Sequence, residues 1–98
     1  MKVRLSAEAE TELETIGDRI AQDDPARAVS FVTELRQACL ALAEFPRRFP
    51  RVAGFEGCGV RHRVHGNYLI FYRVDESEVF VLHVLHGAMD YGPILFCE

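Results

Sequence analysis

The sequence of 98 residues contains no apolar run that approaches the roughly 20 residues a helix needs to cross a bilayer. Its N-terminus also lacks the apolar core of a signal peptide. These absences predict a cytoplasmic protein that makes no contact with a membrane. The composition, with 49% hydrophobic and 27% charged residues, is ordinary for a globular protein, and the length predicts one domain over residues 1–98.

Cysteine is scarce, and its pattern indicates no pairing. The three cysteines are odd in number, and no two of them have the spacing of a metal site. We therefore expect free thiols at Cys39, Cys58 and Cys97, with no metal ion and no other cofactor. The glycines between residues 54 and 59 lack the Gly-Lys-Ser/Thr sequence of a phosphate-binding loop, so no nucleotide site is predicted.

Lysine is almost absent. Lys2 is the only lysine, and arginine carries nearly all of the positive charge. That charge is unevenly distributed. Residues 45–73 contain six arginines and one acid, whereas residues 1–24 contain seven acids and three basic residues. A wholly basic nucleic-acid binder has a different distribution, so we expect direct binding to nucleic acid to be weak or absent.

Two segments show the 3.6-residue period of an amphipathic helix. The first begins after Ser6, a good N-cap. The second begins with Asp24 as N-cap and Pro25 at the first helical position, and it should end near Glu44 because Pro46 disfavours helical geometry at the residue before it. The predicted buried stripes are Ala9, Leu13, Ile16 and Ile20 in the first helix, and Ala28, Phe31, Val32, Leu35, Cys39 and Leu42 in the second. The short connection predicts an αα-hairpin.

Other segments alternate with the period of a β-strand. Residues 2–6 predict a short strand, and residues 60–65, 68–74 and 79–86 predict a three-stranded antiparallel meander. The residues predicted to face the helices are Val3, Leu5, Val60, His62 and Val64, and those predicted to face away are Lys2, Arg4, Arg61, Arg63 and His65. The strand at 68–74 is apolar on both faces apart from Arg73, which indicates either burial on both sides or an apolar groove that awaits a partner.

Residues 45–59 are the longest irregular segment, and they combine aromatic and basic side chains. Phe45 and Phe49 are predicted to anchor this loop to the helices, with Arg47, Arg48 and Arg51 in solvent. The alternative interpretation is a basic loop that contacts nucleic acid or an acidic partner.

The elements occur in the order β-α-α-β-β-β, and their residues resemble the ParE branch of the RelE/ParE toxin superfamily over nearly the whole chain. The resemblance rests on Leu-Ser-Ala-Glu-Ala-Glu at 5–10, Asp-Pro-Ala at 24–26, Leu-Ala-Glu-Phe-Pro at 42–46, Val-Arg at 60–61, Gly-Asn-Tyr-Leu-Ile-Phe-Tyr-Arg-Val at 66–74 and Val-Leu-His-Gly-Ala-Met-Asp at 84–90. It implies an α+β fold in which the helical hairpin packs on one face of a small antiparallel sheet.

The resemblance also implies a function, the toxin component of a type II toxin–antitoxin system. Toxins of the ParE branch bind and inhibit DNA gyrase, and a cognate ParD-like antitoxin neutralises them. Toxins of the RelE branch instead cut mRNA on the ribosome. A non-toxic module that binds an antitoxin is the third interpretation.

Cleavage of RNA by its 2′-hydroxyl needs a base, an acid and a cation for the developing charge. Arg61, Arg63 and Arg73 are the candidate cations, and His83 or His86 is the candidate proton carrier. Against cleavage, Met89 stands where relatives commonly carry an arginine, and no lysine follows Lys2. We therefore favour an inhibitor without catalytic residues. The residues predicted to contact a target or antitoxin are Arg47, Arg48, Arg61, Arg63, Met89, Asp90 and Tyr91.

Overall fold

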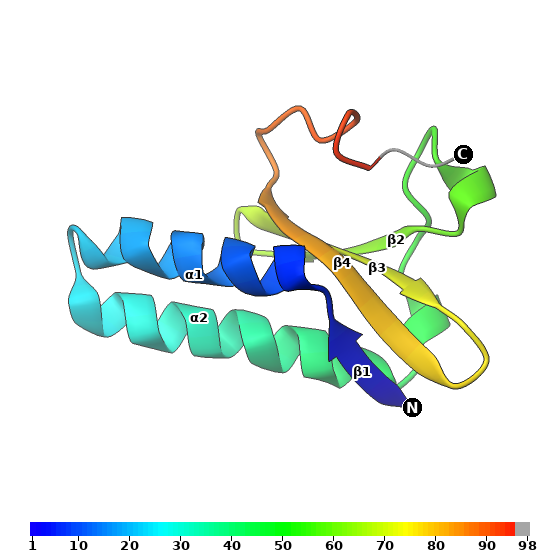
Figure 1. The fold of residues 1–98 in the computed structure, drawn as a ribbon, viewed down its shortest axis with the longest axis horizontal. Coiled ribbons are helices and arrows are strands. Elements are labelled where there is room, and N and C mark those ends of the chain that lie inside the picture. The colour runs from blue at the N-terminus through cyan, green and yellow to red at the C-terminus, as the bar shows by residue number, and fades with distance from the viewer. Residues whose placement is uncertain (96–98) are drawn as a thin grey trace.

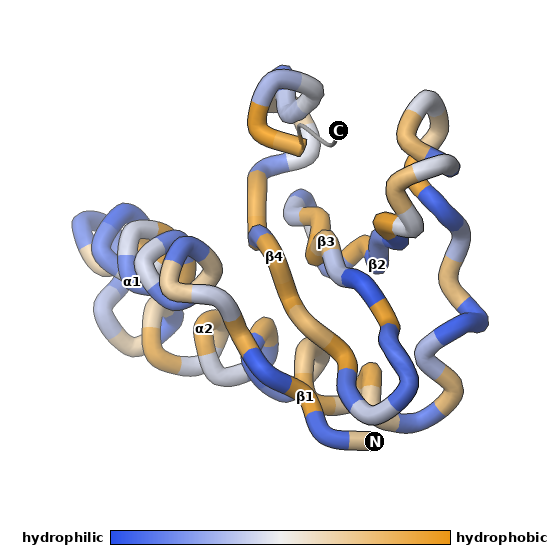
Figure 2. Tube along the Cα trace, turned by 45° about the vertical axis from the view of Figure 1, so that its right-hand side comes forward, coloured by the Kyte–Doolittle hydropathy of each residue, from blue (hydrophilic) through white to orange (hydrophobic). Residues whose placement is uncertain are grey.

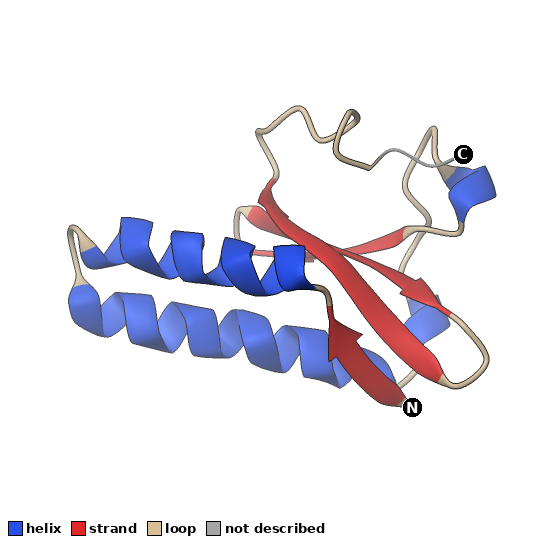
Figure 3. Cartoon of the chain, in the orientation of Figure 1, coloured by secondary structure: helices blue, strands red, loops and turns tan. Residues whose placement is uncertain are grey.

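The computed structural model describes residues 1–95 and has an α+β architecture with the predicted element order. Its regular elements are β1 (Lys2–Leu5), α1 (Ala7–Ala21), α2 (Pro25–Leu40), β2 (Arg61–His65), β3 (Tyr68–Val74) and β4 (Glu78–His86). Figure 3 shows the two helices lying side by side against the strands. No helix in the described part of the chain is long and apolar enough to span a membrane.

Both helices begin at the predicted caps. The Ser6 hydroxyl accepts a hydrogen bond of 2.9 Å from the Ala9 amide, and the Asp24 carboxylate accepts one of 3.0 Å from the Arg27 amide. These bonds satisfy amides that have no partner within the first helical turn. Helix α2 ends at Leu40, earlier than predicted, and a 3₁₀ turn then carries the chain to Glu44.

The four strands form a sheet in the order β1-β4-β3-β2. Strands β2, β3 and β4 pair antiparallel, which confirms the predicted meander. Strand β1 pairs parallel with β4, from Lys2 opposite Glu78 to Leu5 opposite Val81. The sheet is therefore mixed, because the helical hairpin separates β1 from its partner and returns the chain to the far edge of the sheet.

The helical hairpin covers one face of the sheet, whereas the 51–60 loop and residues 91–95 lie over the other face (Figure 1). Tyr72 packs in the cluster on the helical side, and its neighbour Phe71 packs in the cluster on the opposite side. Both are fully buried. Figure 2 shows the resulting hydrophobic band along β3 and β4. Of the two explanations for this apolar strand, burial on both faces is correct.

The predicted orientation of β2 is wrong. Arg63 reaches toward α2, where its Nη1 donates to the Ala38 carbonyl at 3.0 Å, and the His65 ring lies 5.8 Å from the Phe31 ring. Val64 is 62% exposed, and Val60 packs on the side away from the helices. The prediction that apolar residues of this strand face the helices fails because β2 is an edge strand beside the last turn of α2. The carbonyls of that turn have no partners within the helix.

The predicted state of the cysteines is partly wrong as well. Cys39 is free and buried in the core, where burial raises the pKa of its thiol to about 11. Cys58 is disulfide-bonded, so the expectation of three free thiols does not hold. Cys97 lies outside the described residues.

Candidate interaction surfaces

The segment at residues 44–51, called the clamped loop below, is held to the sheet by two side chains. The Tyr72 hydroxyl donates a buried hydrogen bond of 2.6 Å to the Pro46 carbonyl. Burial raises the pKa of Tyr72, so this hydroxyl remains a donor at neutral pH. Arg61 Nη1 donates to the Phe49 carbonyl at 2.7 Å and to the Arg47 carbonyl at 3.1 Å. Arg61, predicted to contact a target, thus fixes the path of the loop.

The two phenylalanines of the clamped loop differ sharply. Phe49 packs against the core as predicted, and its ring lies 4.9 Å from the guanidinium carbon of Arg48 and 5.3 Å from that of Arg63. Phe45 is 75% exposed, so the prediction that it anchors the loop is wrong. Its φ of 52° and ψ of 55° lie in the left-handed region. The following residue is proline, which disfavours the right-handed helical conformation at Phe45.

The exposed arginines of the clamped loop have no acidic partner. Arg47, Arg48 and Arg51 are exposed, and no carboxylate among residues 1–95 forms an ion pair with any of them. Glu44 is the only acid in this loop, and it too is exposed. The loop therefore presents an excess of positive charge to solvent.

The five residues considered for RNA cleavage do not converge on one position. Arg61 and Arg63 lie on the helical side of the sheet, where backbone carbonyls accept their hydrogen bonds. His86 lies on that side too, with its ring edge-on to Tyr68 at 5.2 Å and its Nδ1 accepting from the Ala88 amide. Arg73 lies on the opposite side, where it shares a cavity with His83 alone of the other four candidates.

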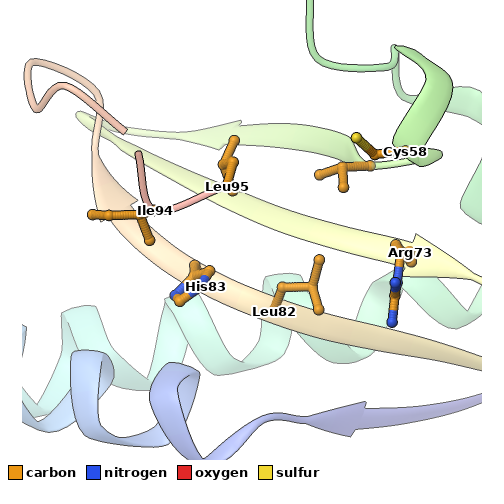
Figure 4. Close-up of a pocket in the computed structure, with 7 residues that line it drawn as sticks. Cys58, Arg73, Leu82, His83, Ile94 and Leu95 are labelled. Carbon is orange, nitrogen blue, oxygen red and sulfur yellow. The ribbon is translucent and has the colours of Figure 1, made fainter. Parts of the chain in front are cut away.

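Arg73 lines a cavity of about 140 Å³ between the sheet and the C-terminal tail (Figure 4). The cavity wall also includes His83 and Leu82 from β4, with Ile94 and Leu95 from the tail. A carboxylate of α1 holds His83, because Glu12 Oε2 lies 2.9 Å from its Nδ1. The cavity wall therefore combines an arginine and a histidine with apolar side chains.

Glu12 has a structural task that sequence reasoning missed. Strand β4 continues past the end of β1, and its edge there faces α1. Glu12 Oε1 accepts from the Val84 amide at 2.9 Å, and the Ser6 hydroxyl donates to the Leu82 carbonyl at 2.7 Å. These bonds replace the missing neighbouring strand. The length mismatch between the predicted strands of residues 2–6 and 79–86 was the available signal.

The predicted tail residues lie in three different environments. Met89 is 47% exposed and lies over a depression of about 160 Å³ whose wall includes Ile16 and Tyr68. Asp90 is exposed. The Tyr91 ring packs 5.0 Å from the Phe71 ring and anchors the tail on the face away from the helices.

A larger apolar groove, called the hairpin groove below, lies between α1 and α2. Its volume is about 540 Å³. Val29 stands in it with 70% of its surface exposed, and Glu14 and Asp18 also line it. A Cβ atom at Gly17 would lie only 3.1 Å from Val32 Cγ2, so glycine allows the close approach of the helices here. An exposed apolar groove of this kind fits the apolar face of a partner segment.

Comparison with known families identifies the chain. The profile of the ParE toxin of the type II toxin-antitoxin system, parDE, matches residues 3–91. The chain belongs to the ParE toxin family. This membership confirms the resemblance and places the chain among the toxins of type II toxin–antitoxin systems.

Solved structures agree with the fold of this ParE-family chain. A chain of the chromosomal ParDE TA system from P. aeruginosa superimposes with a TM-score of 0.77 at 19% identity, covering 88% of this chain and 95% of that one. A chain of the toxin-antitoxin complex RelBE2 from Mycobacterium tuberculosis gives 0.65 at 23% identity, with coverages of 90% and 92%. Comparison with curated protein sequences gives no significant match.

Among residues 1–95, no group of three His, Cys, Asp or Glu side chains is placed to hold a metal ion. Two exposed surfaces are candidates for binding a partner, the hairpin groove and the clamped loop.

Proposed function

We propose that this chain is a single toxin domain that acts in the cytoplasm by binding DNA gyrase and inhibiting it, and that a ParD-like antitoxin neutralises it. One observation carries the choice of inhibition over RNA cleavage. Arg61 and Arg63 donate to backbone carbonyls on the helical side of the sheet, and Arg73 lies on the other side. A crowded phosphate transition state needs cations that converge on it, whereas an inhibitor needs only a complementary surface.

The hairpin groove supports the antitoxin as a partner. Its volume of about 540 Å³ and the exposed Val29 suit the apolar face of a short amphipathic segment. Antitoxin tails that fold on binding use such surfaces, because burial of apolar groups offsets the entropy lost on ordering. The solved relatives come from ParDE and RelBE2 systems, which is consistent with such a partner.

The target is tested by running one preparation in two assays. The purified chain is added to a DNA gyrase supercoiling assay and to a ribosome-programmed mRNA cleavage assay, each with and without the product of the neighbouring reading frame. The proposal predicts inhibited supercoiling or trapped cleaved DNA, relief by the neighbour's product, and intact mRNA. Codon-positioned cuts with normal supercoiling would replace gyrase inhibition with the mRNA endonuclease function. Inactivity in both assays with tight antitoxin binding would identify a non-toxic antitoxin-binding module.

The antitoxin site is tested with a matched pair of substitutions. Val29→Asp places a charge in the hairpin groove, and Val64→Asp places one on an equally exposed position of β2. We expect Val29→Asp to weaken antitoxin binding by about tenfold or more, as for a residue at the centre of an interface. Val64→Asp should leave the affinity unchanged. Equal affinities for both variants would place the antitoxin elsewhere.

A further inference from the structure

Phe45 combines two unfavourable features in one residue. Its backbone adopts the left-handed conformation, which costs free energy for any residue with a side chain, and its ring is 75% exposed. A glycine at this position would remove the strain, and a polar residue would suit the exposure. Neither feature contributes to the core, since the aromatic of this loop that packs against the core is the partly buried Phe49.

The surrounding contacts make this conformation persistent. Tyr72 holds the carbonyl of Pro46, Arg61 holds those of Arg47 and Phe49, and the Arg48 amide donates to the Phe45 carbonyl at 3.1 Å. A side chain held outward on a fixed backbone loses little entropy when a partner covers it. The loop is thus preorganised to present its aromatic ring.

The charges beside Phe45 indicate the kind of partner. Arg47 and Arg48 follow Phe45 closely in sequence, are exposed and have no carboxylate partner in the described chain. Aromatic and arginine side chains are the residue types that most often dominate protein interfaces. A nucleic acid is the poorer fit, since Glu44 is exposed beside the ring and the whole chain has a net charge of −4.

We propose that the clamped loop is the surface that engages the intoxicated protein, with Phe45 entering an apolar pocket that carboxylates border. This inference rests on the proposed function, because it assigns the target contact of a toxin that acts by binding. It places the target apart from the antitoxin. The α2 residues that line the hairpin groove lie between Pro25 and Thr33, whereas the clamped loop follows the other end of that helix. From Val29 to Leu40 the helix rises about 16 Å.

Phe45→Gly is the decisive variant, since glycine accepts the left-handed backbone and only the ring is lost. We expect its thermal midpoint to equal or exceed that of the wild type, with unchanged antitoxin affinity. Its inhibition of DNA gyrase supercoiling should be weaker by about tenfold or more, as for the loss of a central interface residue. Val64→Ala, which trims another exposed apolar side chain, is the matched control and should inhibit like the wild type.

The arginines are tested separately by reversing their charge. Arg47→Glu with Arg48→Glu should slow association with gyrase, and the gap from the wild type should shrink as salt is raised. Arg19→Glu reverses an exposed arginine outside the loop and serves as control. An equal effect of both reversals would mean that general charge, rather than this surface, governs association.

Each outcome decides between the proposals. If Phe45→Gly inhibits gyrase as the wild type does, this inference is overturned while the proposed function stands. If it loses antitoxin binding instead, or if a single-stranded oligonucleotide binds the wild type through Phe45, the assigned partner is wrong. If the wild type leaves gyrase unaffected, the proposed target is wrong. The role of the clamped loop is then tested by whether each variant arrests growth of cells that express it. Arrest that Phe45→Gly abolishes and Val64→Ala retains supports the surface, and any other result there overturns it.

Discussion

The helical hairpin and the clamped loop use arginine in different ways. On the helices, Arg36 pairs with Glu10 at 2.7 Å and Arg27 pairs with Glu34 at 2.6 Å, and all four side chains are more than 40% exposed. Beside the loop, Arg61 and Arg63 are half-buried, and their guanidinium groups donate to backbone carbonyls. The ion pairs on the helices lie on the surface and do not constrain the backbone, whereas the bonds from Arg61 and Arg63 determine the path of the chain.

The difference shows what arginine-rich sequence can and cannot indicate. Exposed ion pairs contribute little to stability because water screens both partners. A half-buried guanidinium bonded to carbonyls contributes more, since its removal leaves acceptors without a donor. The six arginines of residues 45–73 therefore divide into two that bond to backbone carbonyls, Arg61 and Arg63, and four whose side chains are exposed and more accessible to a partner.

The largest expected effect tests the core beneath the helices. Leu35→Asp should unfold the protein, because Leu35 is fully buried and its replacement leaves an unpaired charge there, at a cost of several kcal/mol. Thermal unfolding followed by circular dichroism measures this. Val29→Asp, on an exposed position of the same helix, should change the free energy of unfolding by less than about 0.5 kcal/mol. An unchanged transition for Leu35→Asp would contradict the assigned face of α2.

The next effect separates the two uses of arginine. Arg61→Ala should lower the free energy of unfolding by about 2 kcal/mol, since it removes a charged donor from two carbonyls. Arg36→Ala should lower it by about 0.5 kcal/mol or less, because its ion pair with Glu10 is exposed. Urea unfolding at low and high salt measures both. Equal losses would remove the distinction between clamps and surface pairs.

A smaller effect tests the hydroxyl that holds the clamped loop. Tyr72→Phe deletes the buried bond to the Pro46 carbonyl and should cost about 1 kcal/mol. It should also speed hydrogen exchange at the Arg48 amide, which bonds within this loop. Tyr91→Phe is the matched control, because no hydrogen bond of its hydroxyl is present within residues 1–95. Unchanged exchange in Tyr72→Phe would show that the Arg61 side chain and the bond from the His62 amide to the Pro50 carbonyl hold the loop without this hydroxyl.

The smallest expected effect is the pH dependence of the stability that the Glu10–Arg36 ion pair contributes on the helices. The hydrogen bond from Arg36 lowers the pKa of Glu10 in the folded protein. The pair therefore stabilises the fold at pH values above the pKa that Glu10 has in the unfolded chain. This contribution is lost as the pH falls through the lower pKa of Glu10 in the folded protein. Because both side chains are exposed, the loss between about pH 5 and 3 should be only a few tenths of a kcal/mol. Glu10→Gln should remove it in a pH series of thermal midpoints. A difference of more than about 1 kcal/mol would contradict the surface character of this pair.

Much of the fold could be predicted from the sequence, and the reasons are local. Ser6 and Asp24 are caps whose partners lie three residues away, and the helical stripes of Leu13 and Leu35 follow from periodicity. The orientation of β2 could not be predicted, because it depends on carbonyls at the end of α2 that lie far away in sequence. Phe45 was mispredicted for a related reason, since its exposure depends on Tyr72 and Arg61.

The surfaces were predicted less well than the fold. The basic segment was recognised, but composition cannot show that Arg61 and Arg63 donate to backbone carbonyls while Arg47 and Arg48 have no carboxylate partner within residues 1–95. The role of Glu12 was not predicted, because it accepts a hydrogen bond from β4 only where that strand extends beyond the end of β1. Sites formed within one helix or one turn are visible in sequence, and sites formed between elements are not.

The most direct test of the two-surface account is an NMR footprint of the isotope-labelled chain. Amide signals are followed while the antitoxin's C-terminal segment is added to one sample and DNA gyrase to another. The account predicts that the antitoxin shifts signals around Gly17 and residues 28–33, and that gyrase broadens signals of residues 44–51. If both partners perturb the same residues, or gyrase leaves residues 44–51 unchanged, the separation of target and antitoxin surfaces is wrong.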